Sequence, residues 1–309
     1  MRIKLKSILI LFLLLVFLMP ISTLRASADM GPKPSIHITF ENMSGELCYG
    51  TLLSKSRSTG PYSVWDGVEE NALHSQNDKH YLDYEIWKTF VEYEDSDGYF
   101  FLQNGFEVSK NGALGWGYYP PSTFKILLYF PERNTFAISD VYKRYAFDSY
   151  YTVDLNSLDF TKTDMVGEKT VCAERLVAVQ TYDYTKENVS FVARVTITIA
   201  LELIVALLFG LREKKQFLCF ALTNTFTQTL LNVLLNVIDY ALGAFAFVFY
   251  YVILELVVLV IEAIFYAVFV NKISDQKRKK RRYVWYALVA NLVSFISGLG
   301  IVYIIPSIF

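Results

Sequence analysis

The chain has 309 residues and a formal net charge of −1, and 53% of its residues are hydrophobic and 16% aromatic. This apolar content is high for a soluble protein, so it favours a membrane protein with an attached soluble part. The charges are segregated, because residues 29–190 hold 24 Asp and Glu against 14 Lys and Arg, whereas residues 271–283 hold seven basic residues against Asp275 alone. An acidic region does not attract nucleic acid, which argues against a nucleic-acid partner.

Residues 1–28 have the order of a secretory signal peptide. Basic residues among the first six positions precede an apolar run at 8–19, and the segment ends in the small-x-small sequence ASA. This order predicts cleavage after Ala28, and the alternative is an uncleaved anchor, for which the apolar run is short. Either interpretation places the following segment outside the cytoplasm.

Residues 29–190 have the length of one compact domain and carry repeated strand signals. Asn104-Gly105 and Asn111-Gly112 are hairpin dipeptides, because both central positions of a type I′ turn need positive φ. We therefore expect an α+β membrane protein in which an exported antiparallel β-rich domain, sandwich or barrel-like, precedes a four-helix transmembrane bundle. The predicted strands are 35–40, 86–93, 99–102, 124–130, 135–139, 145–155 and 176–182, with a helix as the alternative at 81–93.

Cys48 and Cys172 are the two cysteines of this domain. In an oxidising compartment they form a candidate disulfide that would close a long loop, and two unpaired thiols are the alternative. The segment 74–83 contains histidine and acidic residues, but their spacing matches no structural zinc site. A polar surface loop explains the segment better, and we expect neither a metal nor a cofactor.

The exported domain contains no motif that indicates an enzyme, since G-x-S-x-G, H-E-x-x-H and P-loop patterns are missing from the sequence. Its aromatic residues can stack on sugars or hold a protein partner, because such rings combine large area with a polar group. They can equally form the core and the cross-strand pairs of a β-domain. The aromatic residues in question are Trp65, Trp87, Trp116, Tyr118, Tyr119, Tyr150 and Tyr151.

Residues 193–305 are the predicted transmembrane domain, because they contain four apolar runs that are long enough to cross a bilayer. The loops at 212–216 and 271–283 are the basic ones, and the positive-inside rule places both in the cytoplasm. Residues 29–190 are then extracytoplasmic, and the protein is a multi-pass protein of the cell membrane. The predicted spans are 195–211, 217–238, 245–270 and 284–305.

Polar side chains recur inside these apolar runs. Amides repeat every four residues along the second span, and acids lie in the first and third. Side chains of this kind would lack hydrogen-bond partners if they faced lipid, so we expect them to converge in the interior of the bundle. This predicted intramembrane polar site consists of Glu202, Asn224, Gln228, Glu255, Glu262 and Asn291.

The predicted spans hold no Lys, Arg or His. The acids are then either protonated and bonded to amides, or ionised around a bound cation or water. Three interpretations follow, namely polar side chains that only join helices, a proton- or cation-handling site, and catalysis inside the membrane. The motifs of the usual membrane proteases are absent, which weighs against catalysis.

The leading hypothesis is a non-enzymatic membrane protein whose exported domain binds an extracellular ligand, a wall component or a partner protein, while the helices anchor it or relay its state. The alternative is a small transporter, or a transporter subunit, that uses the three intramembrane glutamates as a proton or cation relay. Four helices are few for a transporter, so that alternative requires a homo-oligomer or a partner protein. In both hypotheses the lipid bilayer is a partner.

Overall fold

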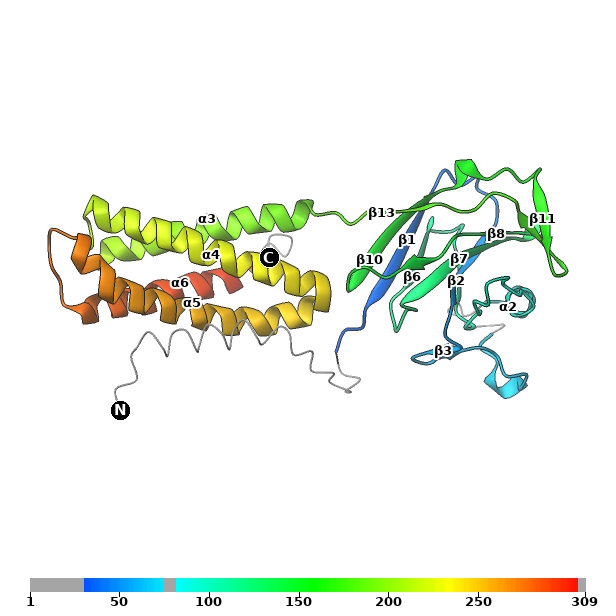
Figure 1. Cartoon of the computed structure of the whole chain (residues 1–309), viewed down its shortest axis with the longest axis horizontal. Helices are drawn as coiled ribbons and strands as arrows, with labels where there is room; N and C mark the ends of the chain where they lie inside the picture. The colour runs from blue at the N-terminus through cyan, green and yellow to red at the C-terminus, as the bar shows by residue number, and fades with distance from the viewer. Residues whose placement is uncertain (1–30, 75–81, 305–309) are drawn as a thin grey trace. The chain divides into compact units, whose positions relative to one another are not determined.

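A computed structural model describes residues 31–74 and 82–304, and the predicted signal peptide lies outside the described residues. The chain divides into two compact units, one at residues 33–190 and one that includes residues 191–304. The first, the β-rich unit, consists of mixed β-sheets with a helix, and the second, the helical unit, consists of long α-helices (Figure 1). Each unit is described separately below.

The β-rich unit contains two main sheets and a small two-stranded one. Its α-helix within the described residues is α2 (Tyr84–Val91), and three short 3-10 helices are η2 (Glu69–Asn71), η3 (Pro131–Arg133) and η4 (Leu155–Ser157). The strands are β1 (Ser35–Glu41), β2 (Tyr49–Ser54), β3 (Ser58–Thr59), β4 (Tyr62–Ser63), β5 (Gly105–Glu107), β6 (Ala113–Trp116), β7 (Thr123–Phe130), β8 (Thr135–Ile138), β9 (Tyr142–Lys143), β10 (Asp148–Asp154), β11 (Thr163–Val166), β12 (Lys169–Cys172) and β13 (Ala178–Gln180).

The two main sheets are mixed, which corrects the prediction of an antiparallel domain. The four-stranded sheet has the order β13-β10-β1-β6, and the larger sheet has the order β11-β12-β8-β7-β2-β5 with β9 beside β7. Strand β1 pairs with β10 in parallel, so that Ser35 is opposite Asp148, and β12 pairs with β8 in parallel. The first of these pairs joins residues 113 positions apart, and the local hydrophobic pattern of a strand carries no information on such a partner.

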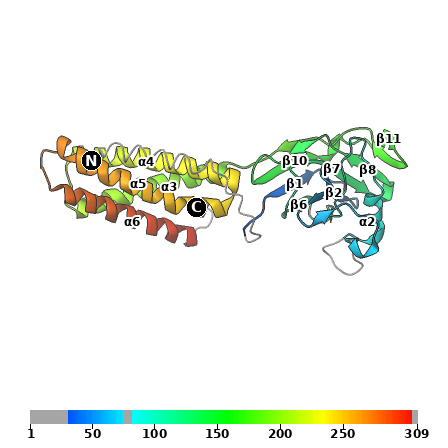
Figure 2. The same ribbon diagram turned by 60° about the horizontal axis from the view of Figure 1, so that its bottom comes forward.

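The larger sheet is covered on both faces. One core lies between the two sheets and includes Ile38 of β1, Ile126 of β7 and Tyr151 of β10. A second core lies on the opposite face of the larger sheet and includes Trp87 and Phe90 of α2. Figure 2 shows α2 beside this sheet. Burial on both faces explains why β7 reads TFKILLYF, a nearly continuous apolar run instead of an alternating one.

Several predicted strands are confirmed and others are corrected. The predicted strands at 124–130 and 135–139 are β7 and β8, which pair antiparallel across η3. Residues 84–91 are helix α2, which was the alternative for this segment, because Trp87 and Phe90 recur at helical spacing and are buried on one face. Neither glycine dipeptide makes a two-residue hairpin, since β5 and β6, on either side of Gly112, belong to different sheets.

Cys48 and Cys172 are both free thiols in the same core, which corrects the candidate disulfide. Cys48 immediately precedes β2 and Cys172 ends β12, and β7 and β8 lie between these two strands. Three strand spacings amount to about 14 Å, whereas a disulfide needs Cα atoms within about 7 Å. The sequence gives no sheet order, so it could not exclude the pair.

We expect both thiols to resist alkylation in the folded protein. Burial raises the pKa of Cys48 to about 12, with Glu46 adding to the effect, and burial raises that of Cys172 to about 11. Below these values the thiols stay neutral, and the thiolate is the reactive form. Iodoacetamide at about pH 8 should therefore modify them only after denaturation. Peptide mass spectrometry checks this, and a Cys48–Cys172 cross-linked peptide from non-reduced protein would contradict it.

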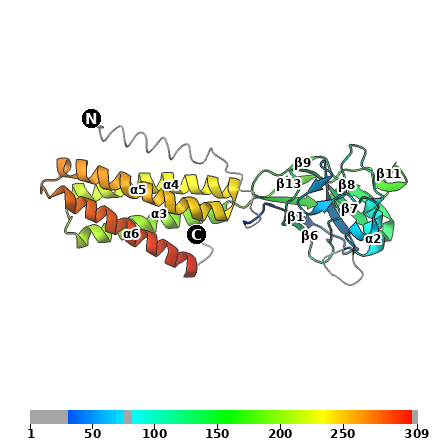
Figure 3. The same ribbon diagram turned by 90° about the horizontal axis from the view of Figure 1, so that it is seen from below.

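The helical unit contains α3 (Thr185–Leu208), α4 (Lys214–Leu242), α5 (Ala244–Ile273) and α6 (Lys280–Ile304) within the described residues. Three of these, α3 from Glu187, α4 and α5, are long and apolar enough to cross a membrane. The helices run alongside one another in every view (Figures 1 and 3). Gly243 alone connects α4 to α5, and its φ of 83° is one that side-chain-bearing residues rarely adopt.

The outer and inner faces of the helices have opposite character. Between Leu218 and Val237 of α4 the large exposed side chains are apolar, among them Leu222 and Phe226, which are 62% and 71% exposed. The buried side chains of the same helix include the amides Asn224, Gln228 and Asn232. A soluble protein buries apolar and exposes polar side chains, so this inverted distribution fits helices surrounded by lipid.

Candidate functional site

Polar residues of α4 form a column along the interior of the helical unit. All of them are buried except Asn236, which is half-buried, because a four-residue spacing keeps side chains on one face of a helix. The column extends over twenty residues, which is about 30 Å of helix and close to the thickness of a bilayer's hydrocarbon core. Its members are Gln216, Asn224, Thr227, Gln228, Asn232 and Asn236.

Glu262 of α5 lies at the middle of this column and is fully buried. Thr227 Oγ1 of α4 contacts Glu262 Oε1 at 2.7 Å, and Asn291 Nδ2 of α6 donates to Glu262 Oε2 at 2.8 Å. One carboxyl group thus joins three helices. The structure brings these two sequence-predicted site residues, Glu262 and Asn291, into direct contact.

Thr227 can adapt to either protonation state of Glu262. Its hydroxyl lies 2.7 Å from Glu262 Oε1 and 3.0 Å from the backbone carbonyl oxygen of Thr223. A hydroxyl has one proton and two lone pairs, so Thr227 can donate to an ionised Glu262. It can also accept from a protonated Glu262 while it donates to Thr223. The carboxyl group can therefore gain or lose a proton without losing this contact.

Glu202 of α3 forms a second contact point, one turn of α4 away from the first. Asn224 Nδ2 donates to Glu202 Oε2, and Asn224 Oδ1 accepts from Tyr266 of α5 at 3.1 Å. The hydroxyl of Tyr286 on α6 donates to the backbone oxygen of Glu202 at 3.4 Å. Within the described chain, Glu202 Oε1 is buried without a protein hydrogen-bond partner. Glu202 and Asn224 are also brought together as predicted site residues.

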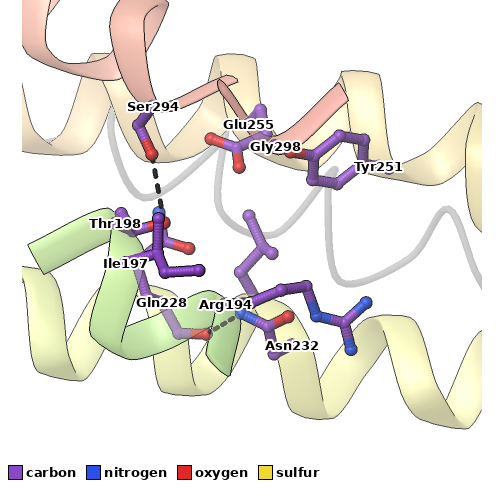
Figure 4. A pocket seen from close by; sticks show the side chains of 10 residues that line it. Arg194, Ile197, Thr198, Gln228, Asn232, Tyr251, Glu255, Ser294 and Gly298 are labelled. Carbon is purple, nitrogen blue, oxygen red and sulfur yellow. Dashed lines mark hydrogen bonds between the residues drawn. The ribbon is translucent and has the colours of Figure 1, made fainter. Parts of the chain in front are cut away.

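Gln228 and Glu255 line a small cavity instead of joining this network. The cavity is enclosed by residues of all four helices, including Arg194, and offers about 10 Å³ to the centre of a water molecule (Figure 4). That is close to the minimum that one water needs. On the α3–α6 side of the cavity Ser294 donates to Thr198 Oγ1 at 3.0 Å.

Arg194 was missed as a site residue, because the predicted first span began after it. It is 6% exposed and donates to Asn236 Oδ1 at 3.2 Å, and its guanidinium lies 5.5 Å from the ring centroid of Phe247. Its partner Asn236 is the final amide of the four-residue repeat on α4. This repeat was the sequence signal that could have indicated a polar partner such as Arg194. The cavity therefore contains one basic and one acidic side chain.

The two basic loops meet at one end of the helical unit, which we call the basic end. The carboxylate of Glu213 accepts hydrogen bonds from Ser274 Oγ and from the backbone amides of Asp275 and Gln276. Lys215 pairs with Asp275 at 2.9 Å. These contacts fix the α3–α4 connection against the α5–α6 connection and place their Lys and Arg residues together.

The β-rich unit contains a larger cavity that sequence reasoning did not find. Its volume is about 370 Å³, within the usual range of small-ligand sites. Trp65, Tyr93, Tyr99 and Phe100 line it, and Arg57 lies over the Phe100 ring at 4.9 Å from the centroid. Only Trp65 belonged to the predicted aromatic set, because the cavity is assembled from three separate segments of the chain.

A buried lysine holds one wall of this aromatic cavity in place. Lys125 of β7 is 1% exposed, and its Nζ lies 2.8 Å from Asp95 Oδ1 and 2.5 Å from Asp97 Oδ2. Asp95 Oδ2 also accepts from the backbone amides of Asp97 and Tyr99, at 3.1 Å and 3.2 Å. The turn between α2 and Tyr99 is thereby fixed to the central strand of the larger sheet.

The predicted polar loop at 74–83 lies partly outside the described residues. His74, which is described, contacts Glu69 Oε1 at 3.2 Å and packs on the rings of Tyr84 and Trp87, each at 4.9 Å between centroids. Within residues 31–74 and 82–304, no cluster of three or more His, Cys, Asp or Glu side chains has the arrangement of a metal site.

Comparisons with protein-family models, with curated proteins and with solved structures found no match to this chain.

Proposed function

We propose that this protein is a multi-pass protein of the cell membrane whose β-rich unit lies outside the cytoplasm and binds a small ligand in the aromatic cavity. The helical unit, in this proposal, is a four-helix bundle that anchors the β-rich unit or relays its state. The predicted signal peptide and the basic loops support this orientation. The inverted polarity of the helices supports their insertion in lipid.

The observation that carries the ligand-binding proposal is the aromatic cavity itself. It is concave, its walls are rings, and charged groups such as Arg57 and Glu94 lie at it. Aromatic rings stack on the apolar faces of sugars, and charged groups hydrogen-bond to hydroxyl and amide substituents. An N-acetylated sugar oligomer, as found in wall material, has both features and is the ligand class that we favour.

Replacing Trp65 with alanine should weaken the binding of such a ligand about tenfold or more, since one stacked ring contributes about 1–3 kcal/mol in comparable stacking sites. The measurement is isothermal titration of the full chain in lipid nanodiscs with oligomers of N-acetylglucosamine. Tyr118→Ala is the matched control, because Tyr118 is an exposed aromatic residue outside the cavity. Equal affinities for the wild type and both variants, or no binding by the wild type, would contradict the proposal.

A second function is favoured by one specific observation, which is the pair of contacts at Glu262. A buried carboxyl group beside a hydroxyl that can donate or accept is suited to binding and releasing a proton. We propose as an alternative that the helical unit is a transporter, or a transporter subunit, in which Glu202, Glu255 and Glu262 handle protons or cations. Glutamine substitutions test it, since glutamine keeps the shape but carries no proton. Unchanged activity in all three variants would refute this alternative.

A further inference from the structure

The polar column on α4 is interrupted at one level only. Between Gln216 and Asn224 the facing position is Phe220, which is fully buried. Its ring lies 4.9 Å from that of Tyr266 on α5 and 4.5 Å from that of Tyr286 on α6, measured between centroids. Both tyrosines are fully buried as well. We call these three residues the three-ring cluster.

The three-ring cluster separates the acids from the basic end. On its basic-end side Gln216 Nε2 donates to Ser274 Oγ at 2.6 Å, and Ser274 contacts Glu213. On its other side Asn224 contacts Glu202 and Tyr266. Among the described residues, no hydrogen bond joins Gln216 to Asn224 or Glu202. Ala206 and Ala287 are also buried in the apolar core of this level, which adds to the seal.

On the opposite side the polar column continues to the end of the unit where Gly243 connects α4 to α5, which we call the turn end. Asn232 and Gln228 follow one another at one-turn spacing, and Asn232 Nδ2 donates to the Gln228 carbonyl oxygen at 2.8 Å (Figure 4). Both line the cavity that also contains Arg194 and Glu255. Arg194 contacts Asn236, two turns of α4 before Gly243 is reached.

Two polar atoms in this cavity lack protein partners within the described chain, namely Gln228 Nε2 and Asn232 Oδ1. Gln228 is 2% exposed and Asn232 is 1% exposed. One is a donor and the other an acceptor, and the space beside them suits one water molecule. The positive charge of Arg194 disfavours a bound cation at the same place, so the chemistry of the cavity selects water.

We propose that the helical unit is a one-sided proton path, open to protons from the turn end and closed by the three-ring cluster toward the basic end. A water in the cavity passes protons between Glu255 and the surface near Arg194. Glu262, two turns of α5 from Glu255, is the inner proton-binding group, and its contact with Thr227 persists in both protonation states. The inference rests on the proton-handling alternative above, and it adds the side from which the acids are reached. With the proposed orientation, that side is extracytoplasmic.

The groups that surround these acids are consistent with exchange from one side. Around Glu262 they are Thr227 of α4, Asn291 of α6, the carboxyl group of Glu202 on α3 and, one turn away, Tyr266 of α5. Around Glu255 the titratable or charged groups are Arg194 of α3 and, on α5, Tyr251 and Glu262. The α4 residues at this cavity are amides and Leu231, and the α6 residues are Ser294 and Gly298.

Opening the three-ring cluster should create a proton leak. We expect Phe220→Ala in proteoliposomes to conduct protons, whereas the wild type conducts none. A trapped pH-sensitive dye measures the proton flux, and a potassium gradient with valinomycin drives it. Phe226→Ala is the matched control, because Phe226 lies on the same helix and faces outward at 71% exposure. Adding Glu262→Gln to Phe220→Ala should abolish the leak.

The outcomes separate the inference from the function on which it rests. A leak that persists in the double variant shows that Glu262 lies off the path and overturns the proton-handling function. A folded Phe220→Ala protein without a leak overturns only the proposed closure by the three-ring cluster, and the proton-handling function is unaffected by that result. Because Phe220→Ala can impair folding, the wild type provides a second test through the infrared carboxyl bands of Glu255 and Glu262, assigned by glutamine substitution. These bands should respond to a pH jump on the side of the β-rich unit, and a response only to a jump on the opposite side overturns the inference.

Discussion

Replacing Lys125 with methionine is expected to lower the free energy of unfolding of the β-rich unit by about 3–5 kcal/mol, because it leaves the carboxylate of Asp95 buried without its cation. The side chain of Asp95 is 1% exposed, so solvent cannot compensate for the loss. Methionine is unbranched and only one atom shorter than lysine, so the cost reflects mainly the lost charge and not a cavity. The measurement is chemical denaturation of the full chain followed by tryptophan fluorescence.

The matched control for this prediction is Lys88→Met. Lys88 pairs with Glu92 at 4.0 Å and is about half exposed, so its loss should cost no more than about 0.5 kcal/mol. Combining Lys125→Met with Asp95→Asn should restore part of the lost stability, since the unpaired charge is removed. Equal effects of the two single lysine variants would show that Lys125 and Asp95 are not a buried pair.

The second ion pair of Lys125, with Asp97, gives a pH dependence. The hydrogen bond and charge of Lys125 hold the pKa of Asp97 below its ordinary value. A carboxylate with a lowered pKa stabilises the folded state above the unfolded pKa of about 4, and this contribution is lost as the pH falls through the folded value. The free energy of unfolding of Asp97→Asn should therefore fall less steeply than that of the wild type as the pH drops below about 4. Near neutral pH the two proteins should show the same pH dependence.

Replacing Glu262 with leucine is expected to destabilise the helical unit by about 1–4 kcal/mol, since two interhelical contacts at roughly 0.6–2 kcal/mol each are lost. Glu262→Gln should cost much less. Its amide oxygen can accept from Asn291, and its amide nitrogen can donate to the hydroxyl of Thr227, which accepts as readily as it donates. Thermal denaturation in detergent micelles measures the difference.

An outward-facing position on the same helix provides the control for the Glu262 variants. Leu256 is 58% exposed, so Leu256→Ala should change the denaturation midpoint little. Equal destabilisation by the leucine and glutamine variants would mean that the charge of Glu262, and not its two contacts, stabilises the helices. That result would contradict the hydrogen-bonded arrangement described above.

The sequence predicted the helical elements well because their signals are local. The four-residue spacing of amides on α4 places them on one interior face, and the structure puts Asn224 beside Glu202 and Asn291 beside Glu262. Arg194 lay outside the predicted first span, because spans are predicted from hydropathy and a basic residue at the edge of an apolar run is left out. Its contact with Asn236 depends on how α3 and α4 are aligned, which no single helix specifies.

In the β-rich unit the nonlocal features could not be predicted. The parallel pairing of β1 with β10 and the separation of Cys48 from Cys172 by two strands both follow from sheet order. The aromatic cavity combines the β3–β4 region with the end of α2 and the segment at 98–101. Each segment alone has an ordinary composition, so none of them indicates that it lines a cavity until the fold brings the three together.

Cysteine labelling in intact cells tests the central claim most directly, which is that the β-rich unit and the basic end lie on opposite sides of the membrane. Met165, 64% exposed on β11, and Lys277 in the basic loop are each changed to cysteine in a chain whose native cysteines are replaced by alanine. A membrane-impermeant maleimide should label Met165→Cys in intact cells and Lys277→Cys only after permeabilisation. Labelling of Lys277→Cys in intact cells would contradict the proposed orientation and, with it, both proposed functions.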